Sequence, residues 1–294
     1  MRPRVIAAFA AVAAALVALA VVLLPRGGER SEGAESAERP PVDRFDERRA
    51  FELLEDQVEL GPRPAGSAAS RRLAERLERL LPNGRLEPVP GGLRNVVGEV
   101  RGREPERVVV VGAHYDTKDL PGFVGANDGA SGTATVVELA RTIQARELGP
   151  TVVFILFDGE ESPPGTPEGE FETAGLRGSR AAAPAYRDAE AMILLDFVGD
   201  RDLELPREAM SDSALWSQLR DAAVRAGHAD AFPPRTAGAI SDDHVPFLRA
   251  GVPAIDLIDF EFDCFHEPCD DLDTVAPESL DAAGESVLEL LRTL

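Results

Sequence analysis

Three runs of consecutive apolar residues constrain the fold of this chain more than any other feature. They are VVVVGA at 108–113, VVFILF at 152–157 and AMILL at 191–195. A strand with one wet face alternates apolar and polar residues, whereas continuous apolar strands are typical of a parallel sheet buried on both faces. Such a sheet needs helices on each side, so the sequence predicts a three-layer α/β fold with a mostly parallel, twisted sheet.

The other predicted elements alternate with these runs along the chain. Strands are predicted at 95–100, 107–113, 151–157, 191–197 and 252–258. Apolar residues at helical spacing predict helices at 48–60, 69–81, 131–146, 213–226 and 277–291. Strands that alternate with helices favour parallel strands joined by helical crossovers. We therefore expect a single folded domain over residues 42–294.

The N-terminus carries a different signal. Residues 5–24, VIAAFAAVAAALVALAVVLL, contain no charge, and a helix of that length spans the roughly 30 Å hydrocarbon core of a bilayer. Residues 1–24 are interpreted as a signal anchor or a cleaved signal peptide. The anchor is favoured because the apolar run continues past the candidate cleavage site Ala18-Leu19-Ala20. The fold would thus be preceded by an N-terminal membrane helix.

The segment after this run and the net charge bound the location and partners. Residues 25–41 are rich in Gly, Ser, Glu, Arg and Pro, which predicts a flexible linker. The domain is therefore expected to be exported and membrane-anchored, or alternatively secreted. A net charge of −21 argues against nucleic acid as a partner, because phosphate binding needs clustered Lys and Arg.

Each apolar run leads into side chains that can bind a metal, and sheets of this kind bind ligands at the carboxyl ends of their strands. Singly, these residues could be helix caps, packed histidines or turn residues. Together, carboxylates at one sheet edge would raise each other's pKa and oppose folding unless a cation offset them. Histidine with carboxylates suits Zn²⁺, as one ion or as a carboxylate-bridged pair. The residues concerned are His114, Asp116, Asp128, Asp158, Glu160, Glu161, Asp196 and His266.

A set of longer motifs resembles the zinc aminopeptidase and glutaminyl cyclase superfamily. They occur in the order typical of that family and cover residues 46–294, so the resemblance implies a zinc exopeptidase-like fold. The motifs are GPRPAGS (61–67), AHYDTK (113–118), FVGANDGASG (123–132), FDGEES (157–162), GLRGSR (175–180), LLDFVG (194–199), SDDHVPFLRAGVP (241–253) and FHEP (265–268).

The resemblance implies a ligand set. Asp128, Glu161 and His266 match the zinc ligands shared by both branches of the superfamily. His114 and Asp196 match the ligands of the second metal in two-zinc aminopeptidases. The number of zinc ions stays open, with one expected for a cyclase and two for an aminopeptidase.

Other residues match roles around the metal. Glu160 corresponds to the general acid/base of the family, and Asp116 to the acid that orients a ligand histidine. Asp242 matches a cyclase residue that helps to hold a hydrogen-bond network near the substrate, in which the residue matching Asp196 also takes part. In FDGEES, Asp158 is then expected to shape the turn while Glu160 moves protons and Glu161 binds zinc.

The resemblance implies an enzyme that acts on the N-termini of peptides or proteins. The wording of FVGA, LLDFVG and DDHVPFLRAGVP favours a glutaminyl-peptide cyclotransferase, which forms pyroglutamate from N-terminal Gln and releases ammonia. Asp256 and Phe265 stand where such cyclases have histidine and tryptophan, and NDGASG leans toward aminopeptidases. A zinc aminopeptidase is therefore the alternative, and a non-catalytic zinc-binding module is a further one.

The two cysteines of the chain lie on either side of a candidate ligand. Cys264 and Cys269 flank His266 in CFHEPC, and in an exported protein this spacing favours a short disulfide. The alternative is that the thiols bind metal.

A serine hydrolase would need a G-x-S-x-G elbow, and GASG at 129–132 lacks that spacing.

Overall fold

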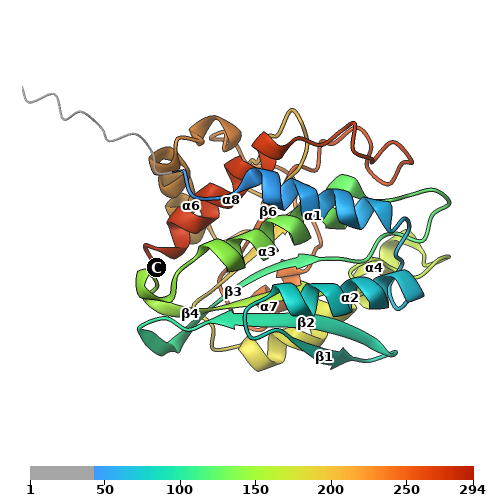
Figure 1. Cartoon of the computed structure of the whole chain (residues 1–294), viewed down its shortest axis with the longest axis horizontal. Coiled ribbons are helices and arrows are strands. Elements are labelled where there is room, and N and C mark those ends of the chain that lie inside the picture. Colours follow the sequence, from blue (N-terminus) through green and yellow to red (C-terminus); the bar gives the residue numbers. More distant parts are fainter. Residues whose placement is uncertain (1–42) are drawn as a thin grey trace, which may run out of the picture. The chain divides into compact units, whose positions relative to one another are not determined.

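A central sheet organises the part of the chain that the computed structural model describes, residues 43–294 (Figure 1). The strand order is β1-β2-β4-β3-β5-β6. The strands β3, β4, β5 and β6 are all parallel to one another. In contrast, β1 and β2 form an antiparallel hairpin, and β2 is antiparallel to β4. Their bounds are β1 (Arg85–Val89), β2 (Leu93–Val100), β3 (Glu104–His114), β4 (Pro150–Phe157), β5 (Ala191–Asp196) and β6 (Ala254–Ile258).

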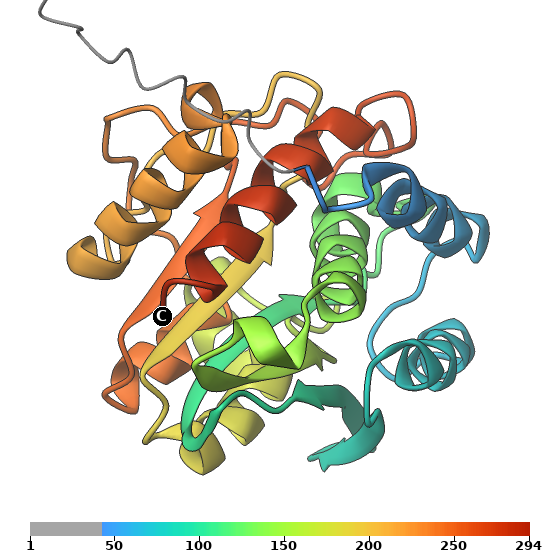
Figure 2. The same cartoon turned by 60° about the vertical axis from the view of Figure 1, so that its left-hand side comes forward.

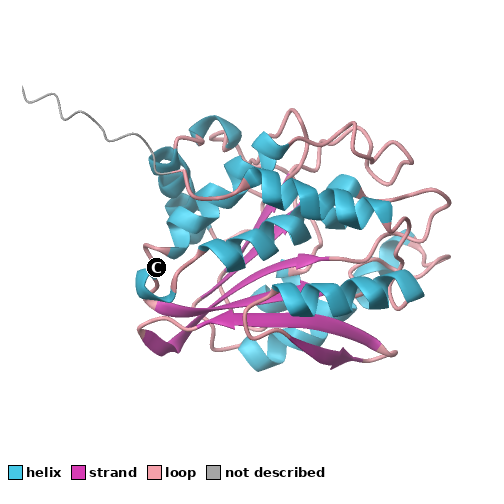
Figure 3. Cartoon of the chain, viewed as in Figure 1, coloured by secondary structure: helices cyan, strands magenta, loops and turns pink. Residues whose placement is uncertain are grey.

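Helices cover both faces of this sheet, as the apolar strands predicted (Figure 3). The core on one face includes side chains from α1, α2, α3, α6 and α8, and the core on the other includes side chains from α5 and α7. Figure 2 shows β5 and β6 side by side behind α8. The helices are α1 (Glu47–Glu59), α2 (Ala68–Leu80), α3 (Gly132–Thr142), α4 (Phe171–Ala174), α5 (Arg177–Ala182), α6 (Ser213–Ala226), α7 (His244–Arg249) and α8 (Pro277–Leu291).

The strand β3 shows why its apolar run is continuous. Val109 and Val111 belong to the core on the α1 and α3 side, whereas Val110 belongs to the core on the α7 side. Successive side chains of a strand point to opposite faces. Because both faces are dry here, neither set of positions can be polar.

The hairpin strand β1 is absent from the predicted elements. Its sequence RLEPV contains Pro88 and is mostly half-exposed, which is typical of an edge strand with no regular pattern. The mostly parallel sheet is thus a mixed one, with its antiparallel pair at one edge.

The N-terminal expectations lie outside the described residues. These are the membrane helix or signal peptide at 1–24 and the linker at 25–41. Among residues 43–294, none of the helices combines the length and the hydropathy that crossing a bilayer requires.

The parallel strands bring four chain segments to one edge of the sheet. In the register of the sheet, His114 at the end of β3 pairs with Phe157 at the end of β4. Likewise Asp196 at the end of β5 pairs with Ile258 at the end of β6. The loops after these strands therefore begin side by side, and they carry the candidate ligands.

Candidate metal centre

Five side chains from five chain segments meet at the carboxyl edge of the sheet. His114 and Asp196 are the last residues of β3 and β5. Asp128 lies in an irregular helical turn before α3, Glu161 follows β4, and His266 lies in the loop after β6. The structure thus brings together the whole predicted ligand set.

These side chains form two trios that share Asp128. In one trio, Nε2 of His114 lies 3.1 Å from Oδ1 of Asp128 and 3.3 Å from Oδ1 of Asp196. In the other trio, Nε2 of His266 lies 3.4 Å from Oδ2 of Asp128 and 3.2 Å from Oε1 of Glu161. Each oxygen of Asp128 therefore faces a different trio, which is the arrangement of a bridging carboxylate.

The donor atoms fit a cation. In each trio, one atom per residue lies within 4.8 Å of the other two. Among the described residues, Nε2 of His114, Oδ2 of Asp128 and Oε1 of Glu161 are buried and have no hydrogen-bond partner. A buried polar atom without a partner costs about 1–3 kcal/mol, and a metal ion would satisfy all three. Imidazole nitrogen and carboxylate oxygen are ligands that Zn²⁺ takes readily.

The charges around the trios are unevenly balanced. Burial opposes ionisation of Glu161, but His266 and Lys118 outweigh it and lower the pKa of that carboxyl. Burial raises the pKa of Asp196 to about 7, even though His114 opposes the shift. Burial also works against the charged form of His114, yet the surrounding carboxylates, Asp196 first, raise its pKa well above the usual value.

Asp116 links the two strand-end loops. Its Oδ1 accepts hydrogen bonds from the backbone N–H groups of Gly159, at 2.9 Å, and Glu160, at 3.2 Å. The same oxygen lies 3.7 Å from Nδ1 of His114. Asp116 thus lies beside the histidine, as the resemblance implied, and it also caps the turn that carries Glu160.

The side chain of Asp158 contacts other segments and does not bind the turn that it was expected to shape. Its Oδ2 accepts a hydrogen bond from the backbone N–H of Arg94 at 3.1 Å, and its Oδ1 accepts one from the Ser70 hydroxyl at 3.4 Å. The side chain therefore joins β4 to β2 and α2, and the turn after β4 is shaped instead by Asp116.

A cavity of about 540 Å³ opens beside the trios. Glu160 lines it, and burial, followed by the charge of Glu161, raises the pKa of Glu160 well above its usual value. Phe265 stacks on His266 with ring centroids 3.8 Å apart. The polar lining includes Lys118, Asp128, Glu160, Glu161, Asp196, Asp242 and His266, and the apolar lining includes Phe171, Phe197, Ile240, Ile258, Phe260 and Phe265.

Buried carboxyl groups surround His244, which is close in sequence to the cavity-lining residue Asp242. Asp242 lines the cavity, and His244 in the first turn of α7 lies 3.4 Å from Glu208 and 3.5 Å from Asp256. Burial, and then the charge of Asp242, raises the pKa of Asp256 well above its usual value. The residue at the cyclase histidine position is therefore a fully buried carboxyl beside His244.

Three further residues contact the ligand segments and were not singled out from the sequence. Lys118 donates to Oε2 of Glu161 at 2.7 Å, Arg63 donates to backbone carbonyls before Asp128, and Asp270 accepts from the backbone of Asp128 at 3.0 Å. Arg63 lies in the motif GPRPAGS and Lys118 in AHYDTK, so these motifs could have indicated both residues. Asp270 follows Cys269 directly and had no such signal.

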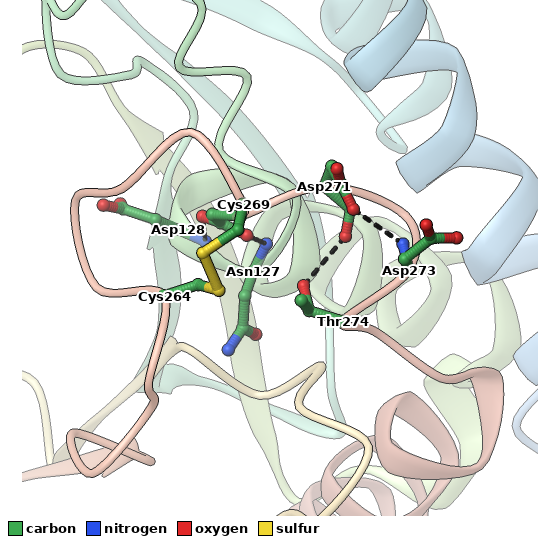
Figure 4. The surroundings of a disulfide bond; sticks show 8 residues. Asn127, Asp128, Cys264, Cys269, Asp271, Asp273 and Thr274 are labelled. Carbon is green, nitrogen blue, oxygen red and sulfur yellow. Dashed lines mark hydrogen bonds between the residues drawn. A yellow bond between two sulfur atoms is a disulfide. The ribbon is translucent and has the colours of Figure 1, made fainter.

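The cysteines on either side of His266 form the expected disulfide (Figure 4). Their sulfur atoms are therefore bonded to each other, and the alternative of thiol ligands is wrong. Both trios consist of His, Asp and Glu side chains and include no sulfur, which agrees with this result.

Known glutaminyl cyclases and aminopeptidases are similar to this chain. A glutaminyl-peptide cyclotransferase of Bos taurus is 29% identical over 245 residues, which cover 68% of each chain. A glutaminyl cyclase structure from Bacteroides thetaiotaomicron has 27% identity and a TM-score of 0.74, covering 86% of this chain and 99% of that one. A leucine aminopeptidase precursor from the same organism has 27% identity and a TM-score of 0.75, covering 87% of this chain and 100% of that one.

The family model of peptidase family M28 matches residues 95–291. The matched segment contains both trios and Glu160. Since it also spans most of the folded domain, this chain belongs to peptidase family M28.

Proposed function

We propose that this protein is a zinc-dependent enzyme that acts on the N-termini of peptides or proteins, and that its reaction is glutaminyl-peptide cyclotransfer. The observation that carries the proposal is the pair of trios joined through Asp128 beside a cavity that Glu160 lines. Asp128, Glu161 and His266 would hold one zinc ion, and His114 and Asp196 would complete a second position with Asp128. Zinc bound there would polarise the substrate carbonyl.

Glu160 would move the proton in this reaction. The α-amine of an N-terminal Gln attacks the carbon of its own side-chain amide, a new C–N bond forms, and ammonia leaves. Glu160 takes a proton from the α-amine and delivers it to the departing nitrogen. Its position next to Glu161, inside the cavity, supports this role.

Asp196 and Asp242 would take part in a hydrogen-bond network near the substrate. Both carboxyl groups line the cavity together with Glu160, which supports this role. The match of DDHVPFLRAGVP to cyclases supports the same role for Asp242.

A zinc aminopeptidase is the second candidate, because both trios are complete and the aminopeptidase precursor matches this chain as well as the cyclase does. In that reaction Glu160 would take a proton from water, and the first peptide bond would be hydrolysed.

Elemental analysis of zinc per chain, with activity measured after chelation and stepwise return of zinc, tests the proposal. Full activity at one zinc supports the cyclase, and a requirement for two supports the peptidase. Activity that survives complete removal of metal would contradict both.

We also propose where the enzyme works. The catalytic domain at 42–294 would lie outside the cytoplasm, joined by the linker at 25–41 to a membrane anchor at 1–24, or secreted after cleavage of that segment. The Cys264–Cys269 disulfide supports an oxidising compartment. Cell fractionation with N-terminal sequencing of the mature protein distinguishes the anchored from the cleaved form, and recovery from the cytoplasm would contradict both.

A further inference from the structure

The segment that carries Asp128 has an irregular backbone. Gly125 has φ +54° and Gly129 has φ +91°, both in the left-handed region, and Asp128 itself has a non-helical ψ of 98°. A segment of this shape cannot satisfy its N–H and C=O groups through a regular helix. The position of Asp128 therefore depends on the groups that bind its backbone.

Asp270 binds three consecutive N–H groups of this segment. Its Oδ2 accepts from Asp128 at 3.0 Å and its Oδ1 from Asn127 at 2.7 Å. Its backbone carbonyl accepts from Ala126 at 3.3 Å. Asp270 is fully buried, so water does not compete for these hydrogen bonds. One residue thus fixes the backbone up to and including the shared ligand.

Arg63 binds the other end of the same segment. Its Nη2 donates to the carbonyl oxygen of Gly125 at 2.9 Å, and its Nε donates to that of Tyr115 at 3.1 Å. Burial lowers the pKa of Arg63 to about 10, against the opposing effect of Asp128, Asp270 and Asp116. The guanidinium is therefore still charged at neutral pH, and Arg63 and Asp270 together hold the two ends of the segment.

The disulfide connects Asp270 to the second histidine ligand. Cys264 and Cys269 are bonded to each other (Figure 4) and close a loop of four intervening residues that includes His266. Asp270 follows Cys269 directly in the sequence. His266 has φ +54°, a left-handed conformation that is unfavourable for a residue with a side chain. A closed loop restricts the alternatives into which such a residue could relax.

We propose that Asp270 is a positioning residue for the metal site, and that the Cys264–Cys269 disulfide keeps Asp270 and His266 in register with each other. One cystine-closed loop thereby places His266 directly and Asp128 through its backbone. The inference rests on the proposed zinc site. It predicts that zinc affinity depends on Asp270 and on the disulfide, although neither contributes a ligand atom.

The test measures zinc affinity of the full-length protein by competition with a chromophoric chelator, with circular dichroism as the check of folding. Asp270→Asn introduces an N–H₂ group beside backbone N–H groups, and we expect the zinc Kd to rise about 10- to 100-fold, as when other groups that orient metal ligands are lost. Cys264→Ser combined with Cys269→Ser should raise it in the same direction. This double variant also avoids thiol reductants, which bind zinc themselves.

Two controls separate positioning from general stability. Asp271→Asn changes the neighbouring carboxylate, whose Oδ1 accepts from the backbone of Asp273 at 2.9 Å, within its own loop, and its zinc Kd should stay within about 3-fold of wild type. Gly284→Ala, whose added Cβ would lie 2.4 Å from the ring of Phe45, is expected to destabilise the domain away from the site, and it should leave the zinc Kd of the folded protein equally unchanged.

Unchanged zinc affinity in both folded Asp270→Asn protein and the folded double-serine variant would overturn the inference. If Asp270→Asn does not fold, the double-serine variant decides alone. Failure of wild-type protein to bind zinc would instead contradict the proposed function, so the two failures are distinguishable.

Discussion

The ammonium group of Lys118 donates a 2.7 Å hydrogen bond to Oε2 of Glu161. The other oxygen of this carboxylate, Oε1, lies 3.2 Å from His266 and has no hydrogen-bond partner among the described residues. Lys118 therefore engages one oxygen of Glu161 and leaves the other directed at the candidate metal position. Groups that orient ligands in this way commonly tune metal affinity.

Lys118→Met should weaken zinc binding while the fold is kept. The substitution removes the charge and hydrogen bond that orient Glu161, so we expect the zinc Kd to rise about 10-fold. Lys118→Arg keeps a cationic donor and should recover part of the affinity. Chelator competition measures both, and an unchanged Kd for Lys118→Met would show that Glu161 needs no such partner.

The neighbouring glutamates should separate catalysis from metal binding. Glu160→Gln keeps the shape of the side chain but cannot accept a proton, so turnover should fall by about 10²- to 10⁴-fold with zinc content retained. Glu161→Ala removes a ligand and should lose zinc. Turnover and zinc per chain are measured on the same samples. Zinc loss in Glu160→Gln with zinc retained in Glu161→Ala would mean that the two roles are exchanged.

Stability should respond to pH at Asp281, far from the metal centre. Burial, followed by the charges of Asp43 and Glu47, raises the pKa of Asp281 to about 7. The folded chain then binds this proton more tightly than the unfolded chain, so the contribution of Asp281 to stability is lost as pH rises from about 4 to about 7. Asp281→Asn should therefore raise the Tm at about pH 8 and change it little near pH 4.

Differential scanning fluorimetry at the two pH values measures this effect. The imidazole of His228 lies 3.4 Å from Oδ2 of Asp281, and burial lowers the pKa of His228, so at about pH 8 losing that partner costs little. Asp188→Asn, at an exposed position, is the matched control and should leave the Tm unchanged at both values. A lower Tm of Asp281→Asn at about pH 8 would refute the assignment.

Gly284→Ala should destabilise the domain. A Cβ atom on Gly284 of α8 would lie 2.4 Å from the ring of Phe45, closer than packed atoms allow. Overpacking of this kind costs about 1–3 kcal/mol. Urea unfolding measures the loss, and Gly238→Ala, where no atom lies within 4 Å of the added Cβ, is the control. Equal stability of the two variants would mean that Phe45 is not packed against α8.

The sequence predicted those parts of the fold that depend on local pattern. The apolar interiors of β3, β4 and β5, and the helices α6 and α8, follow from side-chain periodicity and burial. The strand β1 and the six-residue helix α7 were not predicted, because an edge strand with polar residues and a very short helix carry little periodic signal.

The same division holds at the metal centre. The five candidate ligands, which the structure brings together, could be singled out because strand ends and family motifs mark them. Asp270 could not, because it binds the backbone of Asn127, which lies 143 positions away in the sequence. The pairing of Lys118 with Glu161 likewise depends on how two loops face each other, which only the assembled sheet determines.

The reaction itself is tested most directly by one paired assay. The purified zinc-loaded protein is incubated with a peptide that begins with Gln and, separately, with an aminoacyl anilide, and the products are read by mass spectrometry. The proposed function predicts that the Gln peptide loses one ammonia while the anilide stays intact. Release of the aromatic amine, with the Gln peptide unchanged or shortened by its first residue, would contradict it.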